Sequence, residues 1–154
     1  MQNIRRFRPL LILCACLLLA GLIISFAQAS NSSSAANEYY VYPITPDDPG
    51  WDSHSPAELR ELLRIPEETL DQMDSAQLVQ AVFDYPYLID LFLYSTHEQG
   101  LNALLSECDA LSALILRDDA AKTLLNRLTS VGGPLQQEAL SRLLELPEIA
   151  AQLS

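Results

Sequence analysis

Leucines at helical spacing, interrupted at short intervals by helix breakers, are the strongest constraint on how this chain folds. All 23 leucines beyond the first 29 residues lie in the last 100 residues of the sequence. They recur at three- and four-residue intervals, as in Leu101, Leu104 and Leu105, which places them on one face of a helix. Each run soon meets Pro, Gly or Asp. Residues 55–154 are therefore predicted to be all-α, as a compact bundle or short irregular solenoid of about six short helices.

Capping residues mark where these helices begin. Ser55-Pro56-Ala57-Glu58 has the capping-box pattern, with Pro at the first helical position. Further starts are expected at Asp74 with Gln77, at Tyr87 after Pro86, at Ser95 with Glu98, at Asp109, at Asp118 or Asp119, and at Pro134. Several helix ends share two apolar residues, a charge and a breaker. This repeat-like pattern fits stacked helical hairpins, and chance helix ends explain it equally well.

The N-terminus has the pattern of a secretory leader. Three arginines precede an apolar run from Leu10 to Phe26, and Ala27-Gln28-Ala29 offers small residues at the positions that signal peptidase reads. Residues 1–29 are therefore predicted to be a signal peptide that is cleaved after Ala29. Two alternatives stay open, because the run nearly reaches the length of a bilayer span and Cys16 lies in a weak lipobox-like setting. They are an uncleaved anchor and a lipid-modified chain.

Two segments separate the leader from the helical domain. Residues 30–37 are rich in Ser, Asn and Ala, which is typical of a flexible spacer. Residues 38–54 combine tyrosines with prolines, which excludes a helix and favours an extended aromatic arm. Asp48-Pro49-Gly50 is expected to turn the chain and to bring Trp51 back to the helices. Trp51 then either anchors the arm or offers a binding surface.

The charge balance excludes one class of partner. The chain has 9 Lys and Arg against 20 Asp and Glu, a net charge of -11, and loss of the leader would leave six basic residues and a net charge of -14. A nucleic-acid partner is not expected, because neutralising phosphates requires a basic face. The acidic surface favours solubility and is also able to steer a basic partner.

Motifs for catalysis and metal binding are scarce. No zinc-protease helix, nucleophile elbow or phosphate loop occurs. His54 and His97 are isolated, and the acidic pairs Glu67-Glu68 and Asp118-Asp119 are interpreted as helix-start residues. Asp47, Asp48 and Asp52 are interpreted as turn residues rather than calcium ligands. No metal or cofactor is therefore expected.

Cys108 is the one thiol that would remain after removal of the leader. An internal disulfide would then be impossible, so the core alone would hold the domain together. Cys108 extends the leucine stripe of its helix, and it is interpreted as a buried apolar residue rather than a reactive thiol.

Four segments together resemble a known kind of module: Ile65-Pro66-Glu67-Glu68-Thr69-Leu70, Asp84-Tyr85-Pro86, Glu98-Gln99-Gly100-Leu101 and Leu116-Arg117-Asp118-Asp119-Ala120. The stretch from Tyr42 to about Leu128 is similar to a helical module of uncharacterised exported proteins of Gram-positive bacteria. The resemblance implies export and a helical domain. It carries over no functional residue, because that module has no assigned activity.

These observations favour an exported, non-enzymatic helical domain that binds a protein or a cell-envelope component. Trp51, Tyr85, Tyr87 and Tyr94 are the candidate binding residues, because their rings combine apolar area with a polar tip. Pro86 is expected to turn Tyr85 and Tyr87 outward.

Two other functions are left open by the sequence. One is a cell-wall hydrolase or its accessory domain, and the other is a structural or oligomerising spacer. Membrane contact is expected only through an uncleaved leader, and the sequence does not predict the oligomeric state or the partner.

Overall fold

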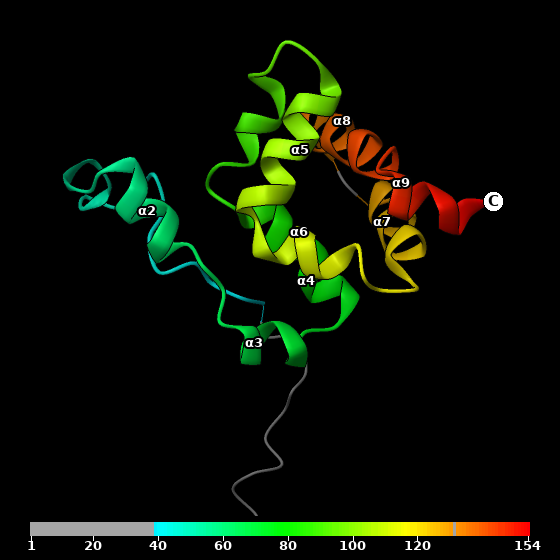
Figure 1. The fold of residues 1–154 in the computed structure, drawn as a ribbon, viewed down its shortest axis with the longest axis horizontal. Coiled ribbons are helices and arrows are strands. Elements are labelled where there is room, and N and C mark those ends of the chain that lie inside the picture. The colour runs from blue at the N-terminus through cyan, green and yellow to red at the C-terminus, as the bar shows by residue number, and fades with distance from the viewer. Residues whose placement is uncertain (1–38, 131) are drawn as a thin grey trace, which may run out of the picture. The chain divides into compact units, whose positions relative to one another are not determined.

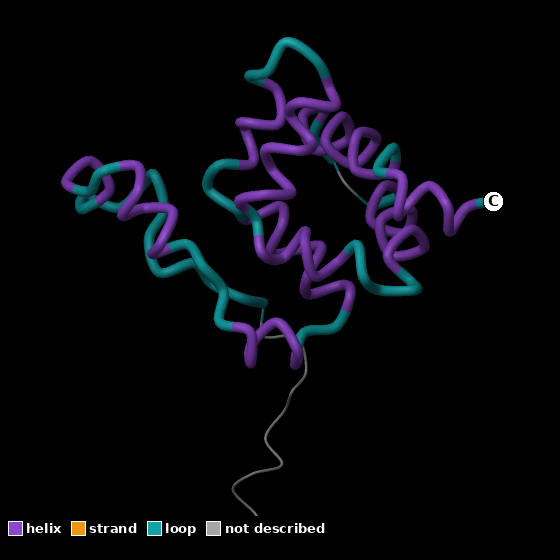
Figure 2. Tube along the Cα trace, in the orientation of Figure 1, coloured by secondary structure: helices purple, strands orange, loops and turns teal. Residues whose placement is uncertain are grey.

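The computed structural model describes residues 39–130 and 132–154. The predicted signal peptide at 1–29, the spacer at 30–37 and the start of the arm at residue 38 lie outside the described residues. Within them the all-α prediction is confirmed, because the structure contains eight α-helices and no strand (Figures 1 and 2). None of the described helices has the length and apolar character needed to cross a membrane. Tyr39–Ser154 forms one compact unit.

The helices are short and closely spaced in the sequence. In chain order they are η1 (Trp51–Ser53), α2 (Pro56–Leu62), α3 (Glu67–Gln72), α4 (Ser75–Asp84), η2 (Leu88–Phe92), α5 (His97–Glu107), α6 (Asp109–Leu114), α7 (Ala120–Leu128), α8 (Pro134–Leu144), α9 (Pro147–Ala150) and η3 (Ala151–Leu153). The η elements are 3-10 helices. There are more α-helices than the six or so predicted, because one-to-two-turn helices such as α3 and α9 carry too few residues to show periodicity.

Two predicted capping boxes are confirmed and one predicted cap is wrong. The Ser55 side chain accepts from the Glu58 amide while the Glu58 carboxylate accepts from the Ser55 amide, and Asp74 and Gln77 make the same exchange. At α5 the cap is Thr96, not Ser95, and its hydroxyl accepts from the backbone amide of Gln99 at 3.2 Å. The sequence offers two adjacent hydroxyl residues there, and only the backbone conformation selects between them.

The predicted helix after Pro86 is a 3-10 helix rather than an α-helix. In η2 the bonds span three residues, as from the Asp90 amide to the Tyr87 carbonyl at 2.9 Å. The helix η2 is only five residues long, which suits this tighter helix.

One apolar core joins the described helices. Its largest fully buried side chains come from α4, η2, α5, α6, α7, α8 and α9 and include Leu78, Leu91, Leu104, Leu111, Leu124, Leu140 and Ile149. The most extensive contacts are those of α4 with α6 and of α5 with η2. The leucine stripes read from the sequence therefore converge on a single interior.

The aromatic arm packs into the same compact unit. Tyr42 is buried, its hydroxyl donates to the Ala81 carbonyl of α4 at 3.2 Å, and its ring lies 5.7 Å from that of Tyr85. Ile44 is also buried. Residues 39–45 lie outside helices and strands, and the chain turns near Asp48, where the Asp48 amide donates to the Thr45 carbonyl and the Trp51 amide to the Asp48 carbonyl. The arm is thus part of the core as well as a connection.

Polar side chains fasten distant helix ends to one another. Asp109, the first residue of α6, accepts from the Ile65 amide at 2.9 Å. Arg117 donates to the carbonyls of Leu70 and Met73 at the end of α3, each at 3.2 Å. These bonds satisfy backbone groups that a short helix leaves free at its ends.

The contact between α5 and η2 depends on a glycine. A side-chain carbon at Gly100 would lie 3.1 Å from the carbonyl carbon of Leu91 and closer still to its oxygen. The same oxygen accepts from Arg142 of α8 at 3.0 Å, and the Arg142 guanidinium lies 4.6 Å from the Phe92 ring centroid. Gly100 therefore allows three elements to meet at one carbonyl.

We predict that Gly100→Ala lowers the free energy of unfolding by about 1–3 kcal/mol, because the added methyl group forces η2 away from α5. Urea unfolding followed by circular dichroism measures this loss. Gly132→Ala is the matched control, since no heavy atom lies within 4 Å of the added carbon. Equal stability of the two variants would contradict the close packing described for this junction.

Candidate binding site

Tyr85 lies in the core and not on the surface. It is 3% exposed, and its hydroxyl donates to the Glu107 carbonyl at 3.3 Å. Burial raises the pKa of the Tyr85 hydroxyl well above its usual value. The expectation that Pro86 turns Tyr85 outward is wrong, because the extended backbone at the end of α4 directs the ring toward Tyr42. Tyr85 has no surface to offer a partner.

Trp51 and Tyr87 lie together and half-buried beside that core. Their ring centroids are 5.5 Å apart, and the Tyr87 ring lies 6.1 Å from that of Tyr85. The Arg60 guanidinium lies 5.9 Å from the Tyr87 centroid. Trp51 thus packs the end of the arm against the helical core. The structure brings Trp51, Tyr85 and Tyr87 into one cluster.

Tyr94 lies apart from this cluster. It follows η2, is 47% exposed, and makes no ring contact with the other three residues in the described part of the chain. The four aromatic residues therefore do not surround one groove.

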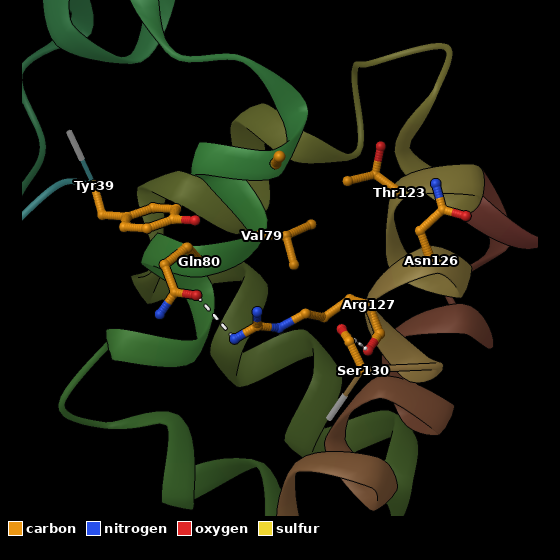
Figure 3. Close-up of a pocket in the computed structure, with 8 residues that line it drawn as sticks. Tyr39, Val79, Gln80, Thr123, Asn126, Arg127 and Ser130 are labelled. Carbon is orange, nitrogen blue, oxygen red and sulfur yellow. Dashed lines mark hydrogen bonds between the residues drawn. The ribbon is translucent and has the colours of Figure 1, made fainter. Parts of the chain in front are cut away.

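A cavity of about 330 Å³ lies between α4 and α7 (Figure 3). Its volume is at the lower end of the range for small-ligand sites. The arm, α4, and α7 with the residue pair after it supply its lining: Tyr39, Ala76, Val79, Gln80, Thr123, Asn126, Arg127 and Ser130. Its walls therefore combine polar and apolar groups in similar measure and carry a single cation.

Arg127 crosses this cavity from α7 toward α4 (Figure 3). Its Nη2 donates to Oε1 of Gln80 at 2.9 Å, and Nε2 of Gln80 donates to Asp84 at 2.8 and 2.9 Å. The guanidinium also lies 5.9 Å from the Phe83 ring centroid. Residues of α4 thereby hold the guanidinium in one position. The buried Nε of Arg127 has no hydrogen-bond partner.

Arg127 and Arg117 are the two arginines of the described residues that form no ion pair. Arg60, Arg64 and Arg142 each form an ion pair, with Glu107, Asp109 and Glu138 respectively, and Arg117 donates to two carbonyls. Arg127 has only a neutral amide as its hydrogen-bond partner. Of these two arginines, Arg127 is the one that lines this cavity, so its guanidinium is placed to meet an anionic ligand.

A second cavity, of about 360 Å³, lies where the start of α5 meets the turn between α8 and α9. It is lined by His97, Glu98, Leu101, Asn102, Glu145, Leu146 and Pro147. No group of three His, Cys, Asp or Glu side chains able to hold a metal occurs in the described residues. Burial and the nearby carboxylate of Glu107 raise the pKa of the Asp90 carboxyl group. Asp90 lines neither cavity.

Cys108 is buried, as the leucine stripe predicts. It is 1% exposed and makes no disulfide, and burial raises the pKa of its thiol to about 12. The thiol is therefore protonated at neutral pH and shielded from reagents.

None of the four binding residues predicted from the sequence lines the cavity between α4 and α7. Arg127 and Gln80 are far apart in the sequence, and only packing brings them together. The one sequence signal that points to Arg127 is the scarcity of cations, since only six basic residues follow the predicted leader. The chain matches no protein-family model, no curated protein and no solved structure.

Substitutions should distinguish the buried aromatic residue Tyr85 from the exposed residue Tyr94 by their effect on stability. We predict that Tyr85→Ser lowers the free energy of unfolding by about 3 kcal/mol, because a buried ring is replaced by a small polar group. Tyr94→Ser should change it by less than about 0.5 kcal/mol, as expected for an exposed position. Thermal and urea unfolding compare the two variants. A stable Tyr85→Ser protein would contradict the placement of Tyr85 in the core.

Proposed function

We propose that this chain is an exported, non-enzymatic helical domain that binds a protein or cell-envelope partner through the cavity between α4 and α7. The observation that carries this proposal is Arg127, a held guanidinium with no anion beside it. A protein with a large excess of carboxylates has many ways to pair an arginine. A cation left without one in a cavity is typical of a binding site.

The lining of the cavity favours recognition over catalysis. It combines a guanidinium, amides and hydroxyl groups with the apolar side chains of Ala76 and Val79. Such groups orient a ligand by hydrogen bonds, whereas proton transfer at neutral pH usually needs a His or a carboxylate in the site.

The aromatic arm has a supporting role in this proposal. Tyr39, at its start, lines the cavity, while Tyr42 and Trp51 fix the arm to the helices. The arm and the cavity between α4 and α7 then act as one site. Trp51 contributes by positioning the arm.

Export remains part of the proposal and rests on the sequence. The arginines, apolar run and small residues of the first 29 positions support secretion or retention at the cell envelope. A partner is therefore sought outside the cytoplasm.

The test is capture of partners from envelope and culture-supernatant fractions by the immobilised full-length protein. We predict that Arg127→Gln reduces recovery of its specific partner at least tenfold, because the variant loses the cation of the cavity. Lys122→Gln is the matched control, since it removes one positive charge from an exposed position of the same helix outside the cavity. It should leave recovery unchanged.

Unchanged recovery by the Arg127→Gln variant would contradict the proposed site. Recovery that falls equally in both would show that the overall charge, and not the cavity, attracts the partner.

A further inference from the structure

Several hydrogen-bond donors are left free in the cavity between α4 and α7. The hydroxyls of Thr123 and Ser130 already donate to the carbonyls of Asp119 and Arg127, each at 2.9 Å. By contrast, three side-chain groups have no hydrogen-bond partner among the described residues: Nη1 of Arg127, the side-chain amide of Asn126 and the Tyr39 hydroxyl. The guanidinium favours a negatively charged ligand, and the Asn126 and Tyr39 side chains are each able to donate a further hydrogen bond to it.

The charge around the cavity favours an anion with a single charge. Arg127 is the only cation in its lining, and the carboxylate of Asp84 lies one hydrogen-bonded residue away through Gln80. A phosphate group would bring close to two negative charges to one guanidinium within an acidic protein. A carboxylate matches the guanidinium in charge and in planar shape.

The remaining walls indicate what the carboxylate is attached to. Ala76 and Val79 provide the apolar part of the lining, and both come from α4 beside Gln80. Their side chains suit a short aliphatic group, since burying apolar surface is favourable and the cavity is small.

We infer that this cavity binds a carboxylate that carries a short aliphatic group, with Arg127, Asn126 and Tyr39 as hydrogen-bond donors. The inference rests on the proposed function and names the chemistry of the ligand. A peptide with a free C-terminus and a small organic acid share this chemistry, and the experiment below distinguishes them.

Holding Arg127 in place makes recognition of so small a group feasible. Gln80 and Phe83 fix the guanidinium from α4 before any ligand arrives, so little side-chain freedom is lost on binding. Gln80 is thus a positioning residue, and Arg127 is the residue that contacts the ligand.

Isothermal titration of the full-length protein in a mild non-ionic detergent tests the inference. The probes are propionate, tri-alanine, tri-alanine with an amidated C-terminus, and inorganic phosphate. We expect saturable binding of propionate or tri-alanine, and none of the amide. Arg127→Gln should weaken that binding at least tenfold, and Lys122→Gln should not change it. Tyr39→Phe should weaken it about fivefold, the effect of one lost hydrogen bond.

The outcomes separate the possible ligands. Tighter binding of tri-alanine than of propionate identifies a peptide C-terminus, and the reverse order identifies a small acid. Phosphate binding tighter than either carboxylate would overturn the inference, as would the absence of saturable carboxylate binding. If Arg127→Gln fails to fold, Tyr39→Phe still decides, because unchanged affinity in that variant contradicts the proposed contacts.

The two experiments distinguish a failure of this inference from a failure of the proposed function. Arg127-dependent capture of a partner without carboxylate binding would keep the cavity as the binding site and reject its ligand. Carboxylate binding without capture of any partner would keep the ligand class and reject the macromolecular partner.

Discussion

The structure depends on one shared apolar core, because no helix in the described part of the chain is long enough to be stable alone. The longest described helices, α5 and α8, have 11 residues each, below the length at which isolated helices persist in water. Each must bury its leucine face against the others. The helix ends that this arrangement brings together are then satisfied by side chains from elsewhere, such as Arg117 at the end of α3 and Arg142 at the Leu91 carbonyl.

Local features of the fold were predictable from the sequence. The capping boxes at Ser55 and Asp74 and the helix start at Pro134 depend on residues within one turn, and the structure confirms them. Features set by packing between distant elements were not. The burial of Tyr85 is an example, because tyrosine suits both a core and a surface and only the contact with Tyr42 decides between them.

The candidate site was even less predictable from the sequence, because it depends entirely on packing between distant elements. The hydrogen-bond partner of Arg127 cannot be read from the sequence, because it depends on the packing of α4 against α7. Only the structure shows that this partner is the Gln80 amide and not a carboxylate. The sequence directed attention to aromatic residues, and three of the four form a cluster that fixes the arm. Their contribution to the site is indirect: they hold the segment that places Tyr39 in the cavity.

The most direct test of this account is to locate where a carboxylate binds. Nuclear magnetic resonance of the isotope-labelled protein, titrated with propionate, resolves the Nε–Hε signals of individual arginines. The account predicts saturable shifts for Arg127 and for the side-chain amide of Asn126, with Arg60 and Arg64 unchanged as internal controls. Shifts confined to residues of the second cavity, such as His97 and Asn102, or no saturable shift of Arg127, would contradict it.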